Sequence, residues 1–64
     1  MKKPLKTVSD IDFLMKEWDF VKNSEEGIDP YKLGAQSNKY AYWICEKGHK
    51  WRAKISNRYI IYLF

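Results

Sequence analysis

The sequence predicts a small α+β module that consists of one N-terminal helix and one β-hairpin. Apolar residues near the start of the chain recur at the spacing of a helix, at Ile11, Leu14, Met15 and Trp18. From Tyr40 onward the apolar period changes to two, which is typical of a strand. A length of 64 residues allows one small domain at most. The change of period therefore indicates where helical structure gives way to the hairpin.

The N-terminal helix is expected over about residues 10–18. Ser9 or Asp10 can cap it, because their side-chain oxygens accept hydrogen bonds from the first backbone N–H groups of a helix. The segment before the helix is rich in lysine and has no apolar period. Residues 1–8 are therefore expected to form a flexible lead-in, and residues 9–64 the folded domain.

A loop is expected between the helix and the hairpin, since turn-forming residues are frequent there. The two strands of the hairpin are joined at Glu46-Lys47-Gly48. Alternation in the first strand places Tyr40, Tyr42 and Ile44 on one face, and Ala41, Trp43 and Cys45 on the other. Alternation in the second strand places His49, Trp51, Ala53 and Ile55 on one face, and Lys50, Arg52, Lys54 and Ser56 on the other. The second strand thus has an apolar and a basic face.

The composition limits the class of protein and its setting. The single cysteine excludes an internal disulfide, and with no signal peptide the chain is expected in the cytoplasm. The longest apolar run, from Tyr59 to Phe64, is far below the ~20 residues of a membrane-spanning helix, so no membrane partner is expected. This β-prone run is expected to pair as a strand or to drive self-association. No catalytic triad or glycine-rich phosphate loop is present, so the chain is not expected to be an enzyme.

Positive charge is concentrated in the C-terminal half. Residues 1–36 hold six lysines against seven acidic residues, a formal charge of −1, whereas residues 37–64 hold six basic residues against one, Glu46, a charge of +5. Three cations occupy alternate positions of the second strand, and a fourth follows at another even-numbered position. Together they form a row: Lys50, Arg52, Lys54 and Arg58. This row is either a solvated face or a surface that contacts phosphates of DNA or RNA. The charge pattern alone favours neither interpretation. For Arg58 a third interpretation is that its guanidinium holds the following loop in place.

Cys45 and His49 are the candidate metal ligands. They are the only cysteine and histidine of the chain, and they flank a short turn in which Gly48 is expected to adopt a positive φ. A structural zinc ion takes four Cys or His ligands in a tetrahedron, so this turn offers two of the four. The alternative is a small buried hydrophobe at Cys45 and an ordinary turn histidine. Taken alone, the pair favours this alternative, because short Cys/His pairs arise often by chance.

Five apolar residues that face inward are expected to form the core: Leu14, Trp18, Trp43, Trp51 and Ile55. Trp51 shares a strand face with His49 and is expected to shield one side of the candidate metal turn. The three tryptophans are also compatible with an aromatic cage or a stacking platform. In a domain of this size, tryptophans more often form the core, and that role is the one predicted here.

A longer pattern runs through the chain in a fixed order: Glu17-Trp18, Asn23, Ser37-Asn38, Tyr42-Trp43-Ile44-Cys45, Gly48-His49-Lys50-Trp51, Ile55 and Asn57-Arg58. This pattern resembles the probable zinc-ribbon, treble-clef-like domain of bacterial and phage proteins. The resemblance implies that Cys45 and His49 are zinc ligands. In that family a proline usually follows the first cysteine, where this chain has Glu46, and a Cys-Pro-x-Cys knuckle follows the Asn-Arg pair. The second ligand pair is therefore expected outside these 64 residues.

The resemblance also implies a function, because this family occurs in some proteins with nuclease domains. The expected function is a non-enzymatic zinc-ribbon module that contributes to nucleic-acid binding. The alternative is a structural or protein-interaction module, such as a repeat unit or an oligomerisation element, without nucleic-acid binding. In either case a homodimer is expected to be possible through a shared zinc ion or through the apolar C-terminal run.

Overall fold

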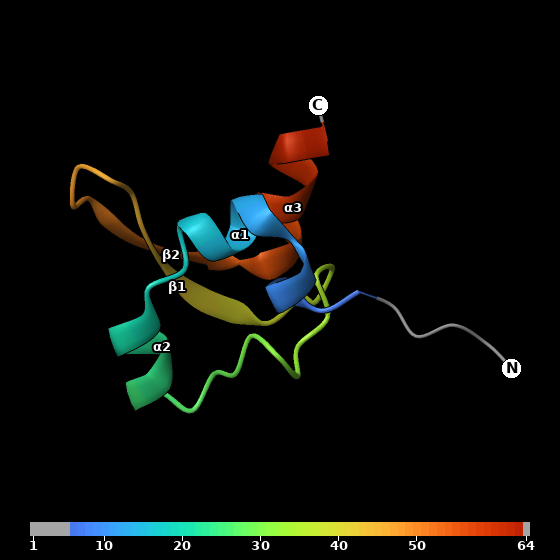
Figure 1. The fold of residues 1–64 in the computed structure, drawn as a ribbon, viewed down its shortest axis with the longest axis horizontal. Helices are drawn as coiled ribbons and strands as arrows, with labels where there is room; N and C mark the ends of the chain where they lie inside the picture. Colours follow the sequence, from blue (N-terminus) through green and yellow to red (C-terminus); the bar gives the residue numbers. More distant parts are fainter. Residues whose placement is uncertain (1–5, 64) are drawn as a thin grey trace, which may run out of the picture.

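The computed structural model describes residues 6–63, and the side chains of residues 6–61. Short helices pack around a two-stranded antiparallel sheet in this part of the chain (Figure 1). In chain order the elements are η1 (Val8–Asp10), α1 (Asp12–Lys16), α2 (Phe20–Glu25), β1 (Tyr40–Ile44), β2 (Lys50–Lys54) and α3 (Ile55–Leu63). The expected α+β class with a β-hairpin is confirmed.

The packed part of the chain begins earlier than the sequence pattern indicates. Val8 is fully buried, and its N–H donates to Leu33 O at 2.9 Å. Thr7 forms an isolated bridge with Gly34. A lead-in that extends through residue 8 is therefore too long, because Val8 belongs to the core. Residues 1–5 of the expected lead-in lie outside the described residues.

Two short helical turns take the place of the single helix expected over residues 10–18. Asp10 belongs to η1, where its side chain accepts a hydrogen bond from Thr7 N–H at 3.0 Å. α1 begins without a side-chain cap, so neither Ser9 nor Asp10 has the predicted role. α1 ends at Lys16, because the residues that follow form backbone hydrogen bonds to the sheet.

Residues 17–19 extend the sheet at the free edge of β1. Ile44 N–H donates to Glu17 O at 2.8 Å, and Asp19 N–H donates to Tyr42 O at 3.1 Å. These bonds satisfy backbone groups that an edge strand otherwise exposes. Apolar spacing alone predicts a continuous helix through Trp18, and these tertiary contacts override it.

The sequence pattern does not predict α2, although both ends of this helix carry familiar signals. Asp19 is the N-cap, and its Oδ1 accepts a hydrogen bond from Lys22 N–H at 3.0 Å. Gly27 follows the helix with a φ of +73°, a conformation that glycine adopts without strain. The turn formers between these ends favour an irregular segment, but the cap at Asp19 and the contact with the sheet make it helical.

Asn23 fixes α2 to the sheet. Its side chain is fully buried, with Nδ2 donating to Tyr42 O and Oδ1 accepting from Tyr42 N–H, both at 2.8 Å. One side chain thus pairs with the edge of β1 in the way that a neighbouring strand does. This contact positions α2 beside the hairpin.

Asn23→Ala is expected to lower the free energy of unfolding by about 1–3 kcal/mol, the usual effect of leaving a buried polar group unpaired. Tyr42 N–H loses its acceptor in this variant, whereas Tyr42 O keeps the bond from Asp19 N–H. Urea denaturation followed by tryptophan fluorescence measures the change. Ser24→Ala, at the exposed next position, is the control and should leave the midpoint unchanged. Equal midpoints for the two variants would show that the Asn23 pairing contributes nothing.

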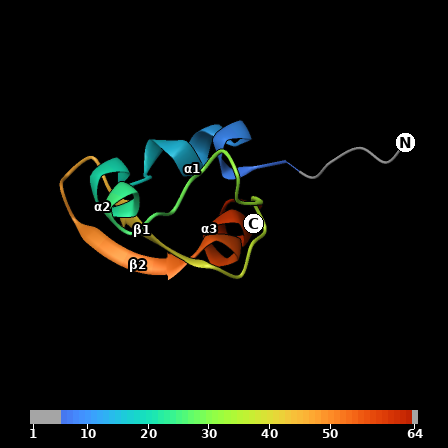
Figure 2. The ribbon, with the colours of Figure 1, turned by 90° about the horizontal axis from the view of Figure 1, so that it is seen from below.

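β1 and β2 pair as the alternating pattern predicts. Trp43 lies opposite Trp51, and Tyr42 lies opposite Arg52. α1 packs over one face of this sheet (Figures 1 and 2). The core between them consists of the buried residues Val8, Ile11, Leu14, Trp18, Ala35, Ala41, Trp43 and Ile55.

The C-terminal apolar run is helical. α3 begins at Ile55, which is fully buried, and continues to Leu63. Tyr59 stacks on Phe13 of α1, with 6.1 Å between ring centroids and 28° between ring planes. The prediction of a strand from Tyr59 to Phe64 is therefore wrong through Leu63, and Phe64 lies outside the described residues. Packing against α1 overrides the β-propensity of the run.

Ile60 and Ile61 are exposed on α3. Self-association through this segment therefore stays a prediction, because the structure shows apolar side chains available for it but no second chain. Within residues 6–63, no helix combines the length and the apolar character needed to cross a bilayer.

Candidate functional site

The turn between β1 and β2 holds Cys45 and His49 at its two ends. Cys45 N–H donates to His49 O at 2.9 Å, and Gly48 N–H donates to Cys45 O at 2.9 Å. Gly48 has a φ of +88°, in the left-handed region that favours glycine. The backbone of the turn is therefore closed by its own hydrogen bonds, and the two candidate ligands occupy facing positions.

The side chains at this turn are accessible. Cys45 is a free thiol and is partly buried, and His49 is exposed. Both views show the turn at one end of the molecule, away from α3 (Figures 1 and 2). A metal ion at this turn can therefore be reached by ligands from another segment or another chain.

Cys45 and His49 are residue types that could supply two of the four ligands of a tetrahedral zinc site. Thiolate sulfur and imidazole nitrogen are the usual ligands of structural zinc, and four of them are needed. Within residues 6–63, no three Cys, His, Asp or Glu side chains are grouped so that they could hold a metal ion. Because the sequence has one cysteine and one histidine, any further Cys or His ligands have to come from elsewhere.

The outer face of the hairpin carries cations and tyrosines. The register sets Tyr40 opposite Lys54 and Tyr42 opposite Arg52. The guanidinium carbon of Arg52 lies 4.1 Å from the centroid of the Tyr40 ring, and Lys54 Nζ lies 5.8 Å from it. Lys50 is exposed at the start of β2. The structure thus places Lys50, Arg52 and Lys54 on one face, with aromatic rings among them.

Arg58 does not continue this row. The chain becomes helical at Ile55, so the two-residue parity of the strand no longer applies. The Arg58 side chain is 15% exposed and forms an ion pair with Glu17. Its guanidinium carbon lies 5.1 Å from the centroid of the Trp51 ring. Arg58 therefore does not have the predicted place in a phosphate-binding row; it joins α3 to the segment that extends the sheet.

The tryptophans have packing roles. Trp18 and Trp43 are buried and meet edge to face, with 5.3 Å between ring centroids. Leu14 and Ile55 are buried in the same core, whereas Trp51 is only partly buried at its border. Two of the three indoles are thus buried away from solvent, so the three tryptophans do not form an open aromatic cage.

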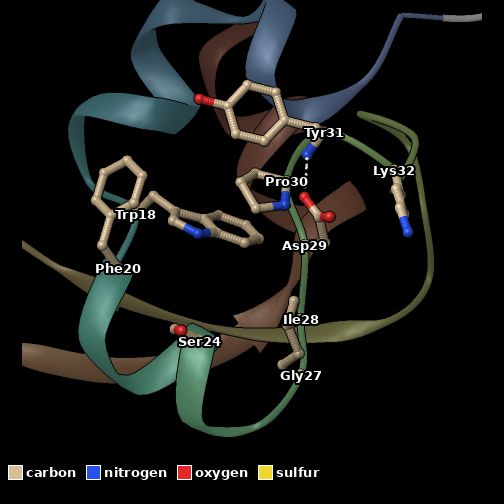
Figure 3. A pocket seen from close by; sticks show the side chains of 9 residues that line it. All are labelled: Trp18, Phe20, Ser24, Gly27, Ile28, Asp29, Pro30, Tyr31 and Lys32. Atoms are coloured by element: carbon tan, nitrogen blue, oxygen red, sulfur yellow. Dashed lines mark hydrogen bonds between the residues drawn. The ribbon is translucent and has the colours of Figure 1, made fainter.

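A hollow of about 490 Å³ lies between α2 and the loop that follows it (Figure 3). Phe20 and Tyr31 flank this hollow, and Trp18 lies between them. Asp29 Oδ1 accepts a hydrogen bond from Tyr31 N–H at 2.8 Å. Among the described residues that line the hollow, none is a predicted metal or phosphate ligand, and the one cation is Lys32. It is therefore not part of the candidate site.

A second hollow, of about 320 Å³, adjoins the basic face of the hairpin. Lys22 of α2 lines it together with Lys50 and Arg52 of β2. Sequence reasoning missed Lys22, because no local pattern links it to the hairpin. The pairing of Asn23 with Tyr42, together with the bond from Asp19 N–H to Tyr42 O, brings α2 to this place.

The fold and the turn define a small zinc-finger-type module. A family model described as a probable treble clef zinc finger domain matches residues 14–61, which include the turn from Cys45 to His49. The chain belongs to this family. A search of curated proteins and a search of solved structures found no match. The zinc-ribbon, treble-clef-like family expected from the residue pattern is thus confirmed.

Proposed function

We propose that the chain is a zinc-binding module whose hairpin contacts nucleic acid. Cys45 and His49 supply two of four zinc ligands, and Lys50, Arg52 and Lys54 contact phosphates. Membership of a zinc-finger family supports the first part, together with a closed turn that carries one thiol and one imidazole. The arrangement of charge on the hairpin supports the second.

The zinc ion has a structural role in this proposal. Four protein ligands leave no open position at zinc for a water molecule or a substrate. A chain of this size buries too little apolar surface to be very stable, so a metal ion contributes directly to folding. The module is accordingly proposed to be non-enzymatic.

Nucleic-acid contact is supported by one main observation: three cations lie on the hairpin face turned away from the core. Neither strand contains an acidic residue. Lysine and arginine on such a face contact phosphates and give affinity without reading the base sequence. Tyr40 and Tyr42 lie on the same face and provide apolar surface beside the charges.

A protein-interaction module is the second candidate, and the exposed Ile60 and Ile61 of α3 favour it. Contact through these side chains is apolar. Its affinity should therefore respond little to salt, whereas binding to phosphates weakens steeply as salt rises. Salt dependence separates the two functions.

Duplex DNA of arbitrary sequence is expected to bind weakly, with an affinity that falls as salt rises. Three cations that neutralise about three phosphates give a slope of log K against log salt of roughly −3. Fluorescence anisotropy of a labelled duplex at several salt concentrations measures this slope. Changing Lys50, Arg52 and Lys54 together to Gln should flatten it and leave the circular-dichroism spectrum unchanged.

The matched control changes Lys6, Lys16 and Lys32 to Gln, because these exposed lysines lie outside the hairpin. This control removes the same formal charge as the hairpin variant. It should keep most of the parent's affinity and slope. If the hairpin variant binds DNA as well as the parent at low salt, the row of cations is a solvated face, and the protein-interaction function becomes the better supported one.

A further inference from the structure

The hollow of about 320 Å³ lies where α2 meets the hairpin. Its volume is at the low end of the range of small-ligand pockets, about 300–1,000 Å³. Residues from both elements line it: Asp19 and Lys22 from the α2 side, and Tyr42, Trp43, Lys50, Trp51 and Arg52 from the hairpin. None of these residues is a proposed zinc ligand.

Cations from two elements converge on this hollow. Lys22 belongs to α2, and Lys50 and Arg52 belong to β2. Among the described lining residues one is acidic, Asp19; it is only 6% exposed, and its Oδ1 accepts the hydrogen bond that caps α2. Lys22 Nζ also lies 3.5 Å from Glu26 Oε2, outside the lining. With Glu26 counted, three cations face two carboxylates, so positive charge still exceeds negative charge around the hollow, which favours an anionic ligand.

Aromatic side chains form another part of the lining. Tyr42 is partly buried, and Lys22 Nζ lies 5.2 Å from the centroid of its ring. Trp51 is also partly buried. The ammonium group lies over the Tyr42 ring. The pair matches the two parts of a nucleotide, because a base can stack on the ring when Lys22 moves off it to pair with a phosphate.

We propose that this hollow accepts one unpaired base of a single-stranded nucleic acid, while Lys22, Lys50 and Arg52 contact the neighbouring phosphates. This inference rests on the proposed nucleic-acid function and adds Lys22 and Tyr42 to it. A base in a duplex is paired and stacked, and it has to leave the helix before it can enter such a hollow. Single strands are therefore bound in preference to duplexes.

The test compares three labelled probes with the full chain at low salt: a thymidine octamer, an abasic octamer of equal charge, and a duplex of the same length. Stacking of one base on an aromatic side chain should make the thymidine octamer bind about 5- to 150-fold tighter than the abasic octamer. Tyr42→Leu should remove most of this difference, since it keeps an apolar side chain without a ring. Tyr42→Phe should preserve the difference.

Lys22→Gln should weaken binding of the thymidine octamer several-fold. Lys32→Gln is its matched control, because Lys32 is exposed and lines the other hollow (Figure 3). If Tyr42→Leu does not fold, base binding is still tested by comparing the affinities of the thymidine and abasic octamers for the parent protein and for Lys22→Gln. Equal affinity for both octamers overturns the base-binding inference and leaves phosphate contact standing. Failure of all three probes to bind rejects the inference and the proposed function together.

Discussion

Arg58→Ala is expected to lower the free energy of unfolding by about 3 kcal/mol, the lower end of the effect of removing one partner from a buried ion pair. The lower end applies because the Glu17 and Arg58 side chains are still 21% and 15% exposed. Arg58 also packs on the indoles, with its guanidinium carbon 5.9 Å from the Trp43 ring centroid and 5.1 Å from that of Trp51. A loss of this size is a large part of the stability of a small domain, about 5–15 kcal/mol.

Urea denaturation of Arg58→Ala measures this loss. Arg52→Ala, at an exposed arginine on the hairpin, is the control and should change stability by no more than about 0.5 kcal/mol. Replacing both partners, as in Glu17→Met with Arg58→Met, should recover part of the loss, because no uncompensated charge then remains. If Arg58→Ala and Arg52→Ala unfold at the same urea concentration, the pair does not stabilise the fold.

The hairpin could be predicted from the sequence because its signal is local. Tyr40 to Lys54 carries an alternating pattern on both sides of a short turn, and the observed register keeps that alternation. The position of the two candidate metal ligands could be predicted for the same reason, since Cys45 and His49 flank the turn that the pattern specifies. The alternation of β2 also predicts that the three cations of this strand share one face: Lys50, Arg52 and Lys54.

Other parts of the fold depend on contacts between distant segments. The run after Tyr59 is β-prone by composition, yet it is helical because Tyr59 stacks on Phe13. In the sequence, Arg58 has the same parity as the cations of β2. In the structure α3 starts at Ile55, and the Arg58 side chain pairs with Glu17. Contacts such as Tyr59 with Phe13 and Arg58 with Glu17 cannot be predicted from the apolar periodicity, because the partners are far apart in the sequence.

The segment from Glu17 to Asn23 shows the same limit. Its apolar spacing predicts a helix through Trp18, but the hydrogen bonds of Glu17 and Asp19 to Ile44 and Tyr42 interrupt helical structure between α1 and α2. Asn23 then pairs with the backbone of Tyr42. These contacts create the second hollow beside the hairpin, which is why Lys22 could not be assigned to the site from the sequence.

Zinc is expected to convert the chain from a monomer into a twofold dimer with one ion per two chains. One turn offers two ligands, Cys45 and His49, and two copies related by a twofold axis offer four. A twofold dimer is the commonest assembly of identical chains. A complete zinc site in a small zinc finger contributes about 10–16 kcal/mol of apparent binding energy, most of which a monomer with two ligands forgoes. The monomer should therefore bind zinc weakly.

Variants at the turn separate a shared zinc site from other modes of association. Cys45→Ser and His49→Gln should each abolish zinc-dependent dimerisation. Lys47→Gln is the control, because this exposed position lies in the same turn and offers no zinc ligand. A dimer that persists in the Cys45→Ser variant, or in the presence of chelator, would point to the exposed Ile60 and Ile61 of α3 instead.

The most direct test of the half-site at Cys45 and His49 is to measure the zinc content and the molar mass of the same sample. Sedimentation gives the mass, and metal analysis of the sedimenting species gives the ratio of zinc to chain. We predict a dimer that holds one zinc ion per two chains and dissociates when zinc is removed. A monomer that retains one zinc ion per chain after dialysis against a mild chelator would contradict the account.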